Sequence, residues 1–263
     1  MSRELGCVPL TASELEWLRI LKRPANADWW KQATSAIAGL SEDKKQGLSM
    51  RHAEPIRWAA ANEPSWLAMD RGQLAATLAD ALKGRRMILR SESGGDAGQK
   101  TERLADNVER MNWADLVSLM VLDRAVHAPG IAEKFWAQAQ EDKGDTTTEY
   151  GGFIGPDGSL FKANLYPPRP TQRFSDTRFV ASDDLLTSGA TGLAVYHFHA
   201  QNMTNTEAAG PSGGDMEYAR DSGRLCVVLT PIGPNTFDVD AYFGSWVRCD
   251  LGTIGQPSAA GSR

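Results

Sequence analysis

The chain has 263 residues, of which 41% are hydrophobic and 23% charged, and these proportions are those of a globular protein rather than a disordered or fibrous one. The net charge of -5 gives no positive field of the kind that neutralises nucleic-acid phosphates, so no nucleic-acid partner is expected. The three cysteines, Cys7, Cys226 and Cys249, form no CxxC pair, which argues for reduced thiols and against a zinc–cysteine site.

The first residues, MSRELGCVPLTASE, carry charges where a signal peptide needs an apolar segment. Nowhere does the chain contain the roughly 18 consecutive apolar residues that a membrane span requires. We therefore expect a cytoplasmic protein with no membrane partner. Export as a folded effector would leave no such mark, so this expectation concerns the place of synthesis.

From Thr11 to about Gln140 the apolar residues recur at helical spacing, beginning with a capping box formed by Thr11 and Glu14. Most of the tryptophans lie in this half, where they are interpreted as anchors of a helical core, with a groove for a partner as the alternative. We predict an all-helical domain over residues 1–144, with later helices at Ala27–Ala38, around Ile56–Ala61, and at Arg71–Leu82, Lys100–Met111, Asn112–Val126 and Ile131–Gln140.

After the polar stretch 141–148 the pattern changes to short strand-like runs between turn residues, which indicates a boundary near residue 145. We predict an α+β two-domain chain, with a mixed-sheet α/β domain over 145–252 and a disordered tail over 253–263. The predicted strands are Tyr150–Ile154, Ser159–Asn164, Leu193–Phe198, Leu225–Thr230, Phe237–Phe243 and Ser245–Cys249, and the predicted helices are Ser182–Leu186 and Gly213–Arg220.

Two of the four histidines form the pair His197-Phe198-His199 at the end of an apolar run. Residues i and i+2 of a strand point to the same face, so both imidazoles can reach one metal ion while Phe198 packs on the other side. Asp215 follows after a long polar loop, and one helical turn would place it on the same face as Ser212. An ordinary helix cap made by Ser212 and Asp215 is the alternative explanation of that pair.

Glu149 is the candidate for a carboxylate that does not bind the metal but carries a proton from metal-bound water to the leaving amine. It precedes Gly151 and Gly152, whose lack of side chains lets neighbouring backbone approach closely. Taken alone, Glu149 is better explained as a solvated acid at the end of a strand.

Together, Glu149, His197-x-His199, Ser212-x-x-Asp215 and an apolar strand ending in Pro231 resemble the JAMM motif of the JAB/MPN metalloproteases. The number of residues between Glu149 and His197 is similar to that in the family, where a hairpin and a connecting helix precede the histidine-bearing strand. The resemblance covers about residues 145–250. The chain departs from the family's pattern in two places: Ala200 replaces the proline after the second histidine, and the stretch from His199 to Ser212 is several residues longer than usual.

The resemblance implies that His197, His199 and Asp215 bind zinc, that Glu149 is the general acid/base, and that Ser212 hydrogen-bonds the oxyanion of the tetrahedral intermediate. It also implies a zinc-dependent peptidase or isopeptidase acting on a protein or peptide. In family members the cleaved bond is often at the C-terminal tail of ubiquitin or a ubiquitin-like protein, which lies extended along an edge strand.

Two other functions are compatible with parts of this pattern. His197, His199 and Asp215 could form the two-histidine, one-carboxylate set of a non-haem iron enzyme, although such an enzyme has no use for Glu149 or Ser212. A non-catalytic binding module, using the tryptophan-rich half, needs none of these five positions.

Overall fold

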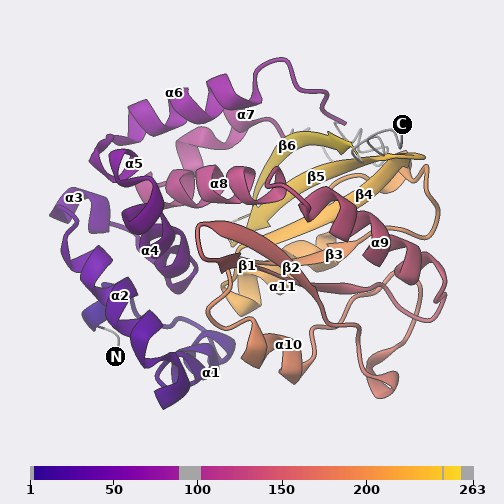
Figure 1. The fold of residues 1–263 in the computed structure, drawn as a ribbon, viewed down its shortest axis with the longest axis horizontal. Coiled ribbons are helices and arrows are strands. Elements are labelled where there is room, and N and C mark those ends of the chain that lie inside the picture. The colour runs from indigo at the N-terminus through magenta and orange to yellow at the C-terminus, as the bar shows by residue number, and fades with distance from the viewer. Residues whose placement is uncertain (1–2, 89–101, 245, 256–263) are drawn as a thin grey trace, which may run out of the picture.

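The computed structural model describes residues 3–88, 102–244 and 246–255, in which a group of helices packs against a six-stranded mixed sheet (Figure 1). Two predicted helices, Ala27–Ala38 and Arg71–Leu82, have the observed bounds. The helices that precede the sheet are α1 (Ala12–Leu21), α2 (Ala27–Ala38), α3 (Glu42–Lys45), α4 (Ala53–Asn62), α5 (Pro64–Ala68), α6 (Arg71–Leu82), α7 (Leu104–Asn107), α8 (Trp113–Val126) and α9 (Ile131–Lys143).

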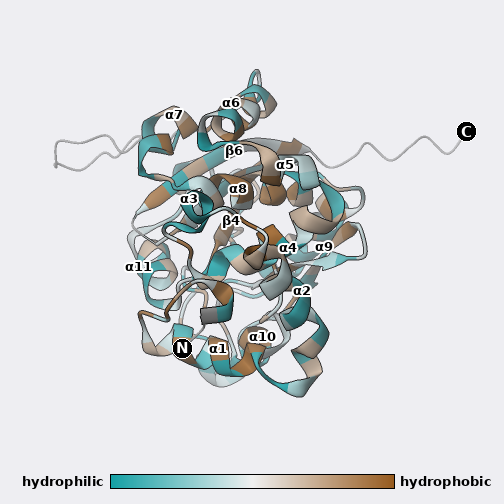
Figure 2. Cartoon of the chain, turned by 90° about the vertical axis from the view of Figure 1, so that its left-hand side faces the viewer, coloured by the Kyte–Doolittle hydropathy of each residue, from teal (hydrophilic) through white to brown (hydrophobic). Residues whose placement is uncertain are grey.

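Side-chain caps determine where the main helices of this half begin. The predicted capping box at the start of α1 is confirmed, since Thr11 Oγ1 accepts from the backbone N–H of Glu14 at 3.1 Å. Asn112 caps α8 in the same way, through the N–H of Asp115. Nearly every residue of α8 is buried, as expected of a helix that is apolar all round, and α3, α4, α6 and α9 contact it. Figure 2 shows α8 inside the molecule, with α1 and α2 at a distance from it.

The predicted helix Lys100–Met111 is wrong in its described part. Its first two residues lie outside the described ranges, and the rest forms the short α7 followed by a 3-10 turn over Val108–Arg110. The Arg71 guanidinium donates to the carbonyl oxygens of Met111 and Val108 at 2.9 and 2.6 Å. These bonds from a distant side chain fix the carbonyl groups outside a regular helix.

The sheet has the strand order β2-β1-β3-β4-β5-β6, in which β3 and β4 are parallel and every other pair is antiparallel. Each predicted strand is present, and both predicted helices between them are observed. The elements are β1 (Gly151–Asp157), β2 (Leu160–Leu165), α10 (Asp183–Ser188), β3 (Ala194–Phe198), α11 (Gly213–Ser222), β4 (Cys226–Gly233), β5 (Thr236–Phe243) and β6 (Val247–Gly255).

The two faces of the sheet have different coverings. Tyr196 and Phe198 of β3 point into the apolar cluster that includes α8 and α9. Val195 and its cross-strand partner Cys226 point to the opposite face, where they join a smaller cluster with α10 and α11. His197 shares this second face because side chains alternate along a strand.

The helical half and the sheet share one continuous buried cluster. The Trp17 indole donates to the carbonyl oxygen of Ala190 at 2.8 Å, and the Arg224 guanidinium lies 4.2 Å from the centre of the Trp17 ring. The Trp58 and Phe161 rings meet at 4.9 Å. The tryptophans therefore serve the core, as predicted, while a division into two domains near residue 145 stays a prediction.

Two further expectations concern the membrane and the C-terminal end. Within the described residues, no helix combines the length and apolar character needed to cross a bilayer. β6 continues through Gly255, so residues 253–255 pair with β5 and do not belong to the predicted tail. Residues 256–263 lie outside the described ranges.

Candidate metal centre

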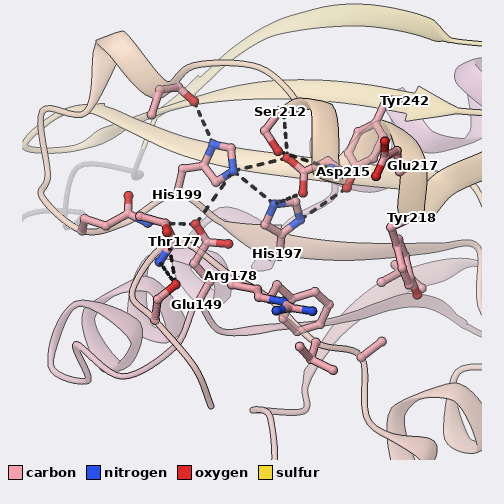
Figure 3. A pocket seen from close by; sticks show the side chains of 18 of the residues that line it. Glu149, Thr177, Arg178, His197, His199, Ser212, Asp215, Glu217, Tyr218 and Tyr242 are labelled. Carbon is pink, nitrogen blue, oxygen red and sulfur yellow. Dashed lines mark hydrogen bonds and ion pairs between the residues drawn. The ribbon is translucent and has the colours of Figure 1, made fainter. Parts of the chain in front are cut away.

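The five residues of the motif meet at one cavity of about 790 Å³, and all of them line it (Figure 3). His197 lies in β3 and His199 immediately follows that strand. Ser212 is the N-cap of α11, Asp215 is in its first turn, and Glu149 precedes β1. Residues separated by up to 66 positions in the sequence are thus brought together by the β1–β3 pairing and by α11.

The imidazoles of His197 and His199 and the carboxylate of Asp215 point toward one another (Figure 3). The two Nε2 atoms are 3.2 Å apart, Asp215 Oδ1 lies 3.3 Å from His197 Nε2, and Asp215 Oδ2 lies 3.5 Å from His199 Nε2. Ligand atoms bound at 2.0–2.1 Å to a tetrahedral zinc ion are separated by roughly 3.3 Å. The three side chains therefore fit the ligand spacing of one zinc ion.

The loop between His199 and α11 holds the His199 ring. His199 Nδ1 is 2.7 Å from the carbonyl oxygen of Ala208, which can only accept, so Nδ1 carries the proton and Nε2 is left for a metal. The Asn205 amide donates to the carbonyl oxygen of His199 at 2.8 Å. Thr204 forms a β-bridge with Ile232 of β4. The loop between His199 and α11 thus folds back onto β4 and orients the His199 ring.

His197 is held from two sides. Its ring stacks on Phe179, with 5.7 Å between ring centres and 5° between planes. Its Nδ1 lies 3.4 Å from the Tyr242 hydroxyl, whose oxygen can accept the Nδ1 proton. In that tautomer Nε2 of His197, like Nε2 of His199, has its lone pair directed at the centre of the cluster.

The charges of the cluster shift the pKa values of its members in opposite directions. Burial disfavours the charge on Asp215, but the neighbouring histidines hold its pKa well below the usual range. Burial also opposes the charge on His199, yet its contact with Asp215 and the charge of Glu149 raise its pKa above the usual value. In the metal-free site Asp215 is therefore ionised, and a cation at its centre is favoured.

Glu149 also lies within reach of an ion at this place, because ligand atoms of Glu149, His197 and His199 all lie within 4.8 Å of one another. Its Oε1 is 4.0 Å from His199 Nε2, farther than either contact of Asp215. The Gln201 amide donates to Oε1 at 2.8 Å, and the carboxylate is buried. Burial raises the pKa of Glu149. Glu149 is therefore a buried carboxylate beside the two histidines, not the solvated strand-end acid that was the alternative.

Gly151 and Gly152 allow the close approach that was predicted for them. A Cβ atom at Gly151 would lie 2.4 Å from the carbonyl oxygen of Tyr196, and one at Gly152 would lie 1.9 Å from that of Asn164. Any side chain at either position would push β1 away from a neighbouring strand. Since β1 begins directly after Tyr150, these glycines also set the position of Glu149 against β3.

Ser212 and Asp215 form the helix cap that was the alternative explanation of their spacing, and they line the cavity as well. Ser212 Oγ accepts from Asp215 N at 3.2 Å, and Asp215 Oδ2 accepts from Ser212 N at 2.7 Å. The cap fixes the Asp215 carboxylate at the positive end of α11, which favours its ionised form. The two explanations are therefore compatible.

Sequence reasoning missed two supporting residues. Gln201, which holds Glu149, is a polar loop residue with no pattern to distinguish it. Asp142 belongs to the polar stretch 141–148, yet it is only 3% exposed and accepts from Tyr150 N at 2.5 Å. Burial and the charge of Glu149 raise the pKa of Asp142 to about 8. It anchors the backbone next to Glu149 from the end of α9.

Comparison with known proteins adds no relative: no family model, no curated protein and no solved structure matches this chain. The case for a function rests on the residues and geometry of the site.

Proposed function

We propose that the chain is a zinc-dependent peptidase or isopeptidase of the cytoplasm, with a helical N-terminal domain and a C-terminal domain of JAB/MPN type. The observation that carries the proposal is the spacing of 3.2, 3.3 and 3.5 Å among the donor atoms of His197, His199 and Asp215. Two imidazoles and one carboxylate are a common ligand set of catalytic zinc, which leaves a fourth position for water. A non-haem iron enzyme would share these ligands but would not require a buried Glu149.

The residues of the chain have separable roles in amide hydrolysis. A bound zinc ion would supply Lewis acidity and lower the pKa of water to about 7. Glu149, held by Gln201 and raised in pKa by burial, receives the proton of the attacking water and donates it to the leaving amine. Ser212 Oγ accepts from Asp215 N, so its own hydrogen is available for a developing oxyanion.

The sheet restricts where an extended substrate can lie. β3 is paired on both sides, with β1 and β4, so a peptide cannot add to the histidine-bearing strand. Residues 179–181 line the cavity, and no hydrogen bond to their backbone groups is found in the part of the chain that the structure describes. An extended tail, such as that of a ubiquitin-like protein, can pair with this segment and place its scissile bond beside Glu149.

The proposal is tested first by the metal content of protein purified without a histidine tag. We expect about one zinc per chain, its loss in His197→Ala, and its retention in His127→Ala, a histidine of the helical half outside the cavity. Cleavage of ubiquitin aminomethylcoumarin and of fluorogenic peptide amides then tests turnover. Iron in place of zinc would favour the oxygenase, and no metal after zinc is added back would favour a binding module.

A further inference from the structure

A second group of acidic residues lies on the same sheet face as the histidines. Asp238 and Asp240 point to this face from β5, and Asp250 of β6 is the cross-strand partner of Asp240. Each of the three places a carboxylate oxygen within 4.8 Å of the others. All three aspartates are fully buried, with an exposed fraction of 0%. β3 and β5 are two strand spacings apart, about 10 Å, so this group is separate from the histidine site.

The carboxyl groups of Asp238 and Asp240 lie against each other and have no other well-formed partner. By ordinary distance and angle criteria, neither oxygen of either side chain receives a hydrogen bond from the described residues, although a proton between the two carboxyl groups would join them. The carboxylate of Asp250 does receive hydrogen bonds: its oxygens accept from the backbone N–H groups of Gly252 at 2.6 Å and Ile88 at 3.1 Å. Burying an ionised carboxylate without compensation is among the most costly arrangements in a protein interior. Something must neutralise this group.

An independent polar group points to a ligand here. Thr230 of β4 is the cross-strand partner of Asp238 and therefore shares its face. Its hydroxyl oxygen is buried and has no hydrogen-bond partner in the described residues. A neutral oxygen beside three carboxylates is a typical composition for a hard-cation site, in which hydroxyl and carbonyl oxygens complete the coordination.

The backbone of β6 is shaped around the group. The β5–β6 register shifts between Asp238 and Asp240, and Gly252, at φ 83°, stands in the shifted segment. The bulge lets the Gly252 N–H turn back to Asp250 and holds that carboxylate opposite Asp240. Bulges that re-aim a side chain in this way are frequent beside functional sites.

We propose that Asp238, Asp240 and Asp250 bind a hard divalent cation of the Mg²⁺, Ca²⁺ or Mn²⁺ class, with the Thr230 hydroxyl as a further oxygen ligand. Oxygen-only donors select these ions over zinc, which prefers the imidazole-containing site. The cation joins β5 to β6 and neutralises charge that no described side chain compensates at Asp238 or Asp240.

The metal-free state shows the same need for neutralisation. Burial and the charges of the neighbouring carboxylates raise the pKa of Asp238 to about 8 and that of Asp240 well above its usual value. Glu102, also buried, adds to this repulsion, and Arg248 approaches Glu102 at 3.9 Å. A cation can replace the protons that the group would otherwise retain.

The site is tested on the full chain, stripped with a chelator and refilled with one equivalent of zinc. Ca²⁺, Mg²⁺ and Mn²⁺ are then titrated singly by calorimetry, and the melting temperature is followed. At a hundred times its dissociation constant, the bound ion should raise Tm by about 5 to 10 °C. Asp240→Asn should lose both the binding heat and the shift, whereas Asp157→Asn, an exposed turn acid, should keep them.

The possible outcomes separate this proposal from that of a zinc peptidase. A response that persists in His197→Ala and disappears in Asp240→Asn supports a second site, whether or not the first binds zinc. A response lost in His197→Ala but kept in Asp240→Asn would assign the ion to the histidines and overturn the proposal. If none of the three ions gave a response and Asp240→Asn raised the Tm of the metal-free protein, the carboxylates would be neutralised by shared protons, and the proposal of a cation site would be overturned. Asp238→Asn provides the same comparison if Asp240→Asn fails to fold.

Discussion

Replacing Glu149 by glutamine separates proton transfer from metal binding. The two side chains have the same shape, and the amide oxygen of glutamine can still accept the 2.8 Å hydrogen bond from Gln201. The three donor atoms closest to one another belong to His197, His199 and Asp215, so the metal should stay bound. Glutamine cannot take or deliver the proton. General acid–base catalysis contributes about 10²- to 10⁴-fold, so kcat should fall by that factor, or roughly 3 to 5 kcal/mol in barrier height.

The assay measures kcat and KM on whichever fluorogenic amide the unmodified chain cleaves, together with zinc content by elemental analysis. We expect KM to change little, because Glu149 acts on the reacting atoms, and zinc content to stay at the level of the parent protein. Gln201→Leu is the matched comparison: it keeps the carboxylate but removes the amide that orients it, and should give a smaller loss. Full activity in Glu149→Gln would refute the mechanism.

Two further predictions concern stability. The pKa of Asp142 is raised to about 8, so its contribution to stability is fully present below the unfolded pKa near 4 and is lost as pH rises through 8. Asp142→Asn should remove this loss, which urea unfolding measures as a slope of up to about 1.4 kcal/mol per pH unit. Parallel curves of unfolding free energy against pH for the two proteins would contradict the prediction. Gly152→Ala would place Cβ 1.9 Å from the carbonyl oxygen of Asn164 and should therefore lower the free energy of unfolding by about 3 kcal/mol. The control variant is Gly213→Ala, where a Cβ meets nothing within 4 Å.

Local signals in the sequence were sufficient for most elements of the fold. The capping box at Thr11 and the apolar periodicity of α2 and α6 depend on residues within one or two helical turns, and these helices were predicted correctly. The segment after residue 101 was not, because the Arg71 side chain, some 40 positions earlier, binds its carbonyl groups. Interactions of that range have no local signature.

Part of the candidate metal centre could be recognised in the sequence for a similar reason, while metal binding itself stays a prediction. His197 lies in β3 and His199 immediately follows it, while Ser212 caps the helix whose first turn holds Asp215, so each pair was recognisable from spacing alone. The position of Glu149 required the family pattern. Gln201 and Asp142, which hold the general base and the backbone beside it, act through contacts between separate elements and could not be found before the fold was known.

One face of the sheet packs against the larger apolar cluster, and the other face carries the candidate ligand residues. Phe237, Val239 and Ala241 alternate with Asp238 and Asp240, a period-two pattern typical of a strand with one solvated face. The polar face of β5 is instead buried, and it is the face to which His197 of β3 also points. Because one face supplies the larger apolar core, the other can hold two groups of candidate ligand atoms, and a cation bound at either group would offset the cost of burying its charges.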